Sequence, residues 1–243
     1  MTTLVKVTIA MVLALFLSSC GFDINIGDFG SGKQGNGIVV EENRQVTQEF
    51  TAVHASEGLD VYVMQSTDFA ISVEADENIM DLIGTDIKNG TLRVHAIENI
   101  GHATKKVFVT LPNVTALESS SGAHLTTQNL IEADRVTIDS SSGSILTAEL
   151  QANAMDIDAS SGANIEVSGT TDKLYVDGSS GANIRAKDLD AKECRADGSS
   201  GANISVNVSN ALTADASSGA NIRYAGDAEV TKSKSVSGSV AKY

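Results

Sequence analysis

The sequence predicts an all-β fold, a parallel β-solenoid with coils of about 18–21 residues. Three observations support this prediction: a short phrase recurs at nearly constant spacing, apolar and polar residues alternate within each copy, and aromatic residues make up only 4% of the chain. A core without aromatic bulk must be filled by small and branched side chains. Such a core suits thin, repetitive β structure better than a large enzyme domain.

The recurring phrase is Ser-Ser-Gly-Ala-Asn-Ile, which occurs four times after residue 159, with looser copies upstream. The glycines of the successive copies are Gly122, Gly143, Gly162, Gly181, Gly201 and Gly219. A degenerate last copy surrounds Gly238. A unit this short cannot bury its own apolar face, so it must stack on its neighbours. Equivalent residues then form ladders with rungs about 4.8 Å apart along the axis.

Within each copy, buried and exposed columns are expected to alternate with a period of two, as in a strand with one buried face. Ile138, Ile157 and Val176 stand five positions before their glycines, and Ile165 and Ile184 stand three positions after theirs. Each unit is therefore strand, turn, strand and a looser return. The varying repeat length disfavours a strict left-handed hexapeptide helix, so a right-handed coil is preferred. A β-propeller or a sandwich is the alternative, but propeller blades need roughly 40 residues.

The predicted solenoid spans residues 48–243. We divide it into less regular N-terminal coils and a cap over 48–115, regular repeats over 116–225, and a C-terminal coil or cap over 226–243. In the first part, Asn89-Gly90 is a strong signal for a hairpin turn. Residues 77–83 are expected to form one or two helical turns.

Residues 1–19 are predicted to be a lipoprotein signal peptide. Lys6 precedes an apolar run over 7–17, which is too short for a spanning helix of roughly 20 residues. Leu17-Ser18-Ser19-Cys20 resembles the bacterial lipobox, so Cys20 is the expected lipid attachment site. An ordinary signal peptide with a stray cysteine is the alternative. Gly21 favours the outer membrane over retention at the inner one. Residues 20–47, polar and rich in glycine, are expected to form a flexible tether.

Composition limits the partners of the mature chain. A formal charge of −14 repels nucleic acid phosphates, so no nucleic-acid binding is expected. The four histidines have no metal-ligand spacing, and no cofactor is expected. Cys194 occupies a column otherwise filled by Val, Met and Leu, so it is interpreted as a small buried hydrophobe.

The most regular polar column lies four positions before the glycine and is acidic. Its members are Glu118, Asp139, Asp158, Asp177, Asp197 and Asp215. We expect each carboxylate to accept backbone N–H bonds from its Ser-Ser-Gly turn, as Asp commonly does. The alternative is a row of Ca²⁺ sites, because hard cations prefer oxygen ligands.

A second polar column lies two positions after the glycine. Its members in the four regular copies are Asn164, Asn183, Asn203 and Asn221. Stacked amides bond along the axis, so we expect a structural ladder that includes the turn glycines. A sugar-binding row is the alternative.

The less regular N-terminal half carries a family resemblance. Residues 50–96 resemble the auto-transporter adhesin "head GIN domain" family through the segments Gly58-Leu59-Asp60-Val61-Tyr62-Val63, Val73-Glu74-Ala75-Asp76-Glu77-Asn78 and Asn89-Gly90-Thr91-Leu92. Leu111-Pro112-Asn113-Val114, leading into Ser119–Gly122, fits the same family. The resemblance covers roughly residues 48–240. It implies a β-helix-like fold in exported, often lipid-anchored proteins, and it supplies no catalytic residues.

These observations predict a non-catalytic cell-envelope lipoprotein that acts as an adhesin or as a surface-binding or structural module. Its expected partners are a membrane, through the N-terminal lipid, and a glycan or surface protein. A polysaccharide-active β-helix enzyme is one alternative, which the near-equal repeats disfavour because they leave no long loop to build a cleft. A periplasmic envelope scaffold is the other.

Overall fold

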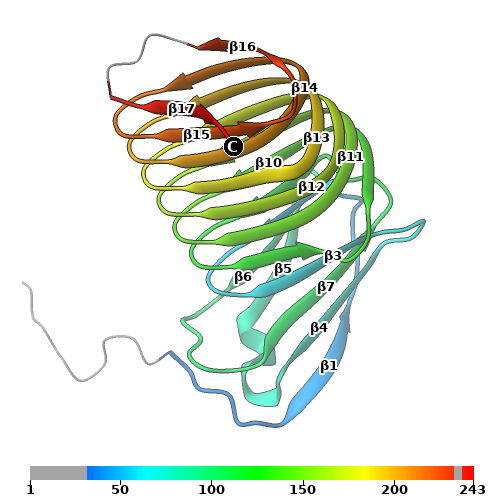
Figure 1. Cartoon of the computed structure of the whole chain (residues 1–243). Coiled ribbons are helices and arrows are strands. Elements are labelled where there is room, and N and C mark those ends of the chain that lie inside the picture. Colours follow the sequence, from blue (N-terminus) through cyan, green and yellow to red (C-terminus); the bar gives the residue numbers. More distant parts are fainter. Residues whose placement is uncertain (1–31, 233–236) are drawn as a thin grey trace, which may run out of the picture. The chain divides into compact units, whose positions relative to one another are not determined.

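The computed structural model describes residues 32–232 and 237–243, which form a β-solenoid with a mixed N-terminal cap (Figure 1). The cap and first coil contain β1 (Val39–Arg44), β2 (Ala52–Ala55), β3 (Asp60–Gln65), β4 (Ala70–Asp76), the 3₁₀ helix η1 (Glu77–Leu82), β5 (Ile83–Lys88), β6 (Thr91–Ala96) and β7 (Lys105–Leu111). The stacked coils contain β8 (Ala116–Ser119), β9 (His124–Thr127), β10 (Ile131–Ser140), β11 (Ile145–Ala159), β12 (Asn164–Gly178), β13 (Asn183–Gly198), β14 (Asn203–Ala216), β15 (Asn221–Ala225), β16 (Glu229–Lys232) and β17 (Ser239–Lys242). The predicted all-β solenoid is confirmed.

Each regular coil is one chain segment that runs along both long faces of the solenoid. We call face A the strand portions that follow a Ser-Ser-Gly turn (residues 145–150 in β11) and face B those that precede the next turn (153–159 in β11). Successive coils pair in parallel with the glycine alignment preserved, so that Ile157 lies beside Val176 and Val176 beside Ala196. The last coil, β16 and β17, continues this pairing onto β14 and β15.

The core between the two faces is filled almost entirely by Ile, Leu, Val, Met and Ala. The columns that hold Ile138 and Ile165 are fully buried. Near the turns the coil narrows and the inward residues become small. A Cβ on Gly178 would lie 3.1 Å from Ile204 Cδ1 of the neighbouring coils. Small residues at this edge therefore let the branched side chains of the next rungs pack against the backbone.

The Ser-Ser-Gly-Ala segments form stacked turns in which two consecutive residues are left-handed. In one copy, Ser161 has φ 52° and Gly162 has φ 74°. Ala163 N donates to Ser160 O at 3.0 Å, which closes a type I′ turn. Gly162 N donates to Ser180 O of the next turn at 3.1 Å, so neighbouring turns are also bonded along the axis.

The N-terminal part completes the first coil and then departs from the solenoid pattern. β2 and β3 pair in parallel with β8 and β9, and β6 and β7 pair in parallel with β2 and β3. β4 is antiparallel to β7, and β5 is antiparallel to β6. The Asn89-Gly90 hairpin is confirmed, since both residues have positive φ between β5 and β6. The helical turns expected over 77–83 are present as η1.

The tether predicted over residues 20–47 was wrong for its described part. β1 lies within that range and pairs antiparallel with β4. The segment before β1 is bonded to the cap: Gly37 N donates to Asp76 Oδ1, and Lys33 N donates to Asn99 O at 2.9 Å. The strand escaped prediction because it is an exposed edge strand without a buried apolar face. The signal peptide, Cys20 and the first part of the tether lie outside the described residues.

Cys194 is buried in the core, with 5% of its surface exposed, between Leu174 and Leu212 of the adjacent coils. Burial, with a smaller contribution from Asp197, raises the pKa of the Cys194 thiol to about 12. A thiol with so high a pKa is a poor nucleophile at neutral pH. Cys194 therefore acts as a small hydrophobe, as predicted.

The turn geometry predicts the effect of replacing a turn glycine. Gly162→Ala should destabilise the protein by about 1–2 kcal/mol, because an L-residue is strained in the left-handed region. A Cβ at Gly162 would meet nothing within 4 Å, so the loss comes from backbone strain alone. Equilibrium urea unfolding measures the change. Gly162→Asn is the matched control and should cost less, because Asn tolerates left-handed backbone; equal stability of Gly162→Ala and wild type would contradict the assigned turn.

Candidate functional site

A groove lies on the edge opposite the Ser-Ser-Gly turns, where face A bends into face B. Its volume is about 860 Å³, within the range of small-ligand sites. The bend arises because the in–out alternation is interrupted there. In β12, Thr171 is buried and both Asp172 and Lys173 are exposed before Leu174 is buried again. Two consecutive outward residues force the strand to turn.

Three columns of residues build this groove, which we call the corner groove. Its floor is a register-matched column of small residues: Ala133, Ala152, Thr171 and Ala191. The residues before the floor form one wall: Glu132, Gln151, Thr170, Asp190 and Asn207. The residues after the floor form the other wall: Asp134, Asn153, Asp172 and Lys192. A small residue between two outward polar residues is thus repeated coil after coil.

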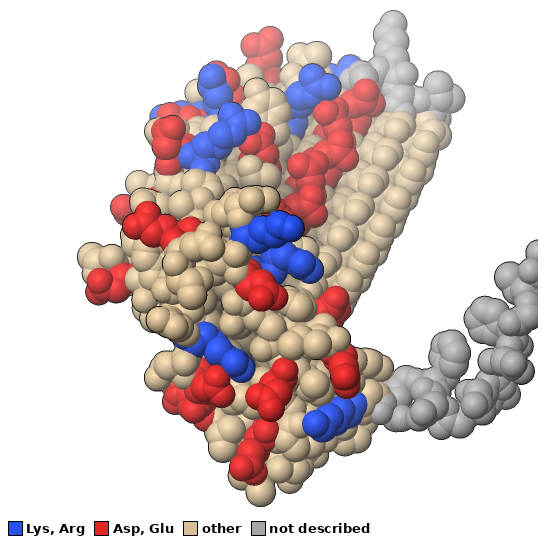
Figure 2. All heavy atoms as spheres, turned by 180° about the vertical axis from the view of Figure 1, so that it is seen from behind, with Lys and Arg blue, Asp and Glu red and all other residues tan. Residues whose placement is uncertain are grey.

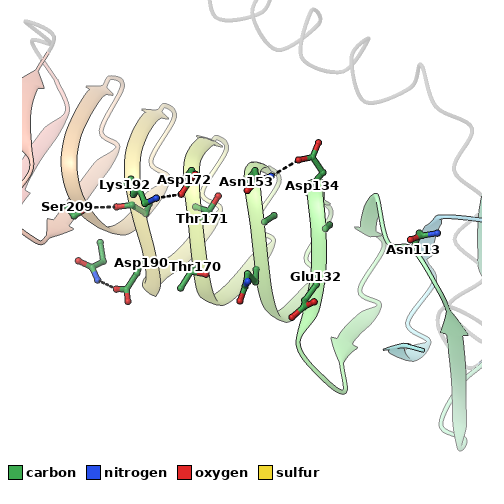
Figure 3. Close-up of a pocket in the computed structure, with 15 residues that line it drawn as sticks. Asn113, Glu132, Asp134, Asn153, Thr170, Thr171, Asp172, Asp190, Lys192 and Ser209 are labelled. Atoms are coloured by element: carbon green, nitrogen blue, oxygen red, sulfur yellow. Dashed lines mark hydrogen bonds and ion pairs between the residues drawn. The ribbon is translucent and has the colours of Figure 1, made fainter. Parts of the chain in front are cut away.

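Hydrogen bonds between coils hold several of these wall side chains in place (Figure 3). In the second wall, Asn153 Nδ2 donates to Asp134 Oδ1 at 2.6 Å, and Lys192 Nζ lies 2.7 Å from Asp172 Oδ1. In the first wall, Asn207 Nδ2 donates to Asp190 Oδ1 at 2.6 Å. These bonds run along the solenoid axis, so the walls are ordered parallel to it.

The corner groove is lined mainly by hydrogen-bonding groups, and its net charge is negative. Its lining includes four carboxylates (Glu132, Asp134, Asp172, Asp190) and one lysine. Hydroxyls and amides supply the remaining polar groups, and no aromatic ring from the described residues lines it. The arrangement suits a ligand that presents many hydroxyl or amino groups along an extended chain. Sequence reasoning missed this groove, because the return segments differ in sequence and only their stacking brings the two walls together.

The acidic column is placed as predicted, on the outer side of face B. Asp139, Asp158, Asp177, Asp197 and Asp215 are register partners in consecutive strands. Figure 2 shows a row of acidic side chains that runs from coil to coil beside an uncharged strip. Glu118 continues the column downward, and His54 lies beside it with Nδ1 3.9 Å from Glu118 Oε2.

The expected role of these carboxylates at the turns was wrong. The N–H groups of the turn glycines and of the alanines that follow donate to backbone carbonyls instead, as in Gly181 N to Ser200 O. Arg195 Nε donates to Asp197 Oδ2 at 2.9 Å, so this carboxylate points along the face. Within residues 32–232 and 237–243, no group of three or more His, Cys, Asp or Glu could hold a metal ion. The row of Ca²⁺ sites therefore finds no support there.

The asparagine column forms a side-chain ladder on face A. Asn183 Nδ2 donates to Asn164 Oδ1 at 3.3 Å, and Asn203 Nδ2 to Asn183 Oδ1 at 3.3 Å. Asn221 Nδ2 continues the ladder to Asn203 Oδ1 at 3.4 Å. Each amide also donates to the carbonyl of its own turn glycine, as Asn164 does to Gly162 O. The predicted structural ladder is present.

Repulsion within the acidic column has a measurable consequence at Asp158. Burial raises the pKa of Asp158, and the neighbouring charges of Asp177 and Asp139 raise it further. A raised pKa means that the folded state binds the proton more tightly than the unfolded chain. The contribution of this carboxyl to stability is therefore present below its ordinary pKa and lost as the pH rises through the raised value.

Asp158→Asn should accordingly raise the Tm at neutral pH, with the gain shrinking as the pH falls through the raised pKa of Asp158 and gone below the ordinary value of about 4. Thermal unfolding followed by circular dichroism across this range measures the difference. The matched control is Asp188→Asn, which lies outside the column and should give no gain, because Lys187 Nζ lies 2.7 Å from Asp188 Oδ2. A lowered Tm of Asp158→Asn at pH 7 would show that the column is not repulsive.

Among the described residues, no helix is long and apolar enough to cross a membrane.

A comparison with curated proteins gives no match. Solved structures with the same fold include a "putative adhesin" from Bacteroides fragilis, with a TM-score of 0.78 at 19% identity, covering 87% of this chain and 100% of the other. A "putative lipid binding protein" from Parabacteroides distasonis has a TM-score of 0.72 at 20% identity and covers 86% and 98%. A "putative adhesin" from Parabacteroides merdae has a TM-score of 0.71 at 21% identity and the same coverage.

The family comparison is more specific than these structural likenesses. The model of the family described as "Putative auto-transporter adhesin, head GIN domain" matches residues 49–228. The match includes the cap from β2 onward, the regular coils, the acidic column and the asparagine ladder. An adhesin-like family of this kind indicates a protein of the cell surface or envelope. The chain belongs to this family, the head GIN domain family.

Proposed function

We propose that this protein is a non-catalytic lipoprotein of the cell envelope that binds an extended, hydroxyl-rich polymer, such as a glycan, along the corner groove. The observation that supports this most directly is the repetition of two polar walls over successive coils. A site that repeats with each coil suits a ligand that also repeats along its length. A ligand of compact shape would use only one or two of these rungs.

Order within the walls favours binding over a purely structural role. The inter-coil bonds of Asn153, Lys192 and Asn207 fix these side chains before any ligand arrives. Less side-chain entropy is then lost on binding, which is the general advantage of a preorganised site. Without aromatic platforms, affinity must come from many weak hydrogen bonds, so we expect it to increase with polymer length.

The alternative of a polysaccharide-active enzyme has less support. Asp158 is a carboxyl with a raised pKa, as a general acid requires, but it lies on face B and not in the groove. The coils that border the groove are of nearly equal length, and no long loop within the described part of the chain encloses it. A ligand could therefore associate along the groove without the closed, water-excluding environment that catalysis usually needs.

Attachment through a lipid on Cys20 completes the proposal, with the outer membrane as the expected location. The described chain enters the fold at the cap, where Asp76 and Asn99 bind the segment before β1. Most residues that line the corner groove belong to the stacked coils β10–β14, whereas the described chain enters the fold beside β1 in the cap (Figure 1). The alternative of a periplasmic scaffold differs in location and partner, and protease treatment of intact cells separates it from a surface protein.

Cys20→Ala should abolish incorporation of labelled palmitate and release the protein from membrane fractions, because Cys20 is the proposed acceptor. Cys194→Ala, which removes the buried thiol, is the matched control and should leave labelling unchanged. Labelling that persists in Cys20→Ala would contradict lipid attachment at this position.

Binding along the groove is tested with an array of neutral polysaccharides and their oligomers. Thr170→Arg places a long side chain in one wall and should weaken binding tenfold or more. Thr213→Arg, the same change at an exposed position on face B, should leave binding intact. Affinity should increase with oligomer length for the wild type. Equal loss in both variants, or no polysaccharide binding, would contradict the groove proposal, and release of shortened products would contradict a non-catalytic role.

A further inference from the structure

We infer that face A carries a second binding site, specific for the carboxylates of an acidic polysaccharide and formed by Arg185, Arg223, Ser205 and Tyr243 beside the asparagine ladder. These residues line a hollow of about 200 Å³, separate from the corner groove. The site does not depend on the polymer proposed for that groove, since no residue is shared between them.

Strand register places the two arginines at a defined separation. Arg185 lies beside Ser205, and Ser205 beside Arg223, in three consecutive parallel coils. Two steps between strands separate the arginine backbones by about 10 Å. Glu166 precedes Arg185 in this column and Ala241 follows Arg223, so the cationic stretch is limited to these three coils.

Neither guanidinium is used within the fold. Arg185 and Arg223 form no hydrogen bond or ion pair with any residue that the structure describes. By contrast, Arg135 and Arg195 on face B are bonded to Asp156 and Asp197. In a chain with 31 acidic and 17 basic residues, two unpaired arginines in one hollow stand out from the surface around them. Their charges are therefore available to an external anion.

The neighbouring groups favour a sugar carboxylate over an isolated ion. Asn183, Asn203 and Asn221 line the same hollow, and their amides are already aligned by the ladder. Ser205 lies between the arginines, and its hydroxyl donates to Ile184 O at 3.2 Å while its oxygen remains an acceptor. Tyr243, a residue that is 64% exposed, adds an aromatic side chain on which a sugar ring can pack.

The spacing selects the type of polymer. A guanidinium binds a carboxylate through two parallel hydrogen bonds, which a lysine cannot reproduce. Two guanidinium groups that lie two coils apart suit a polysaccharide chain that carries a carboxylate on every second sugar. Phosphate groups have related chemistry, so anionic lipid headgroups are the competing source of the anion.

The test uses the full-length protein in a non-ionic detergent, with hyaluronan as a polymer that has a carboxylate on alternate sugars and dextran as the uncharged comparison. Calorimetry should detect hyaluronan binding that weakens as salt is added, because the contacts are between exposed charges. Arg185→Ala and Arg223→Ala should each weaken it tenfold or more. Arg185→Lys should recover only part of the affinity, because the charge remains but the fork is lost.

Arg195→Ala on face B is the matched control, since it removes an arginine of equal charge that already pairs with Asp197. It should leave hyaluronan binding within twofold, and unchanged Tm values would show that all variants fold. Equal affinity in the Arg185→Ala/Arg223→Ala double variant and the wild type overturns the inference. Arginine-dependent binding to phosphatidylglycerol vesicles, with none to hyaluronan, overturns the choice of carboxylate. The effect of Thr170→Arg on polysaccharide binding tests the proposal for the corner groove and not the proposal for face A.

Discussion

Register between successive coils is the constraint on which the rest of this molecule depends. A coil of about 20 residues has no inside of its own, and its apolar column is covered only when the equivalent residue of the next coil lies directly above it. On face B this condition is met by Ile157, Val176 and Ala196, which are register partners in successive coils. At the turns, each glycine N–H donates to a backbone carbonyl of the next turn, so the backbone is also held in register there. A shift of one residue would turn each inward side chain outward. The repeats therefore fix register wherever they are regular.

Fixed register has a second consequence on the outside. Polar residues that recur at the same position of each coil are stacked in a column along the axis, whether their side chains attract or repel one another. The asparagine ladder gains hydrogen bonds from this arrangement, whereas the aspartate column brings like charges together, which adds to the effect of burial in raising the pKa of Asp158. Positions that do not affect the core are free to differ from coil to coil. The outward neighbours of the asparagines include Glu166, Arg185 and Arg223, and this variation confines the cationic part of face A to a few coils.

The corner groove follows from the same geometry at the least repetitive part of each coil. There the alternation of inward and outward residues is interrupted, and a small floor residue such as Ala152 or Thr171 lies between two exposed neighbours. The walls then run parallel to the axis because the coils do. The two surfaces proposed for binding, the corner groove and face A, thus follow from a fold that is held together by its interior and its turns.

The parts of the fold and of the candidate site that could be predicted are those in which the sequence is most periodic. The columns around Gly162, the asparagine ladder and the burial of Cys194 were predictable, because each residue has equivalents in the other copies. The antiparallel pairing of β1 with β4 was not, because β1 is exposed and has no repeat partner. The bonding of the turn amides to backbone carbonyls also escaped prediction, since the aspartates four positions earlier offered an equally plausible acceptor. The corner groove depends on how return segments of different sequence stack.

A disulfide cross-link between adjacent coils tests the assigned register most directly. Thr147 and Glu166 are register partners on face A, and both are exposed. The Thr147→Cys/Glu166→Cys protein should form an intramolecular disulfide readily under mild oxidation, because partner residues in adjacent strands are within the reach of an S–S bond. Thr147→Cys/Ser168→Cys, two residues out of register, should not. Cross-linking of the second pair in preference to the first would contradict the stacked-coil account.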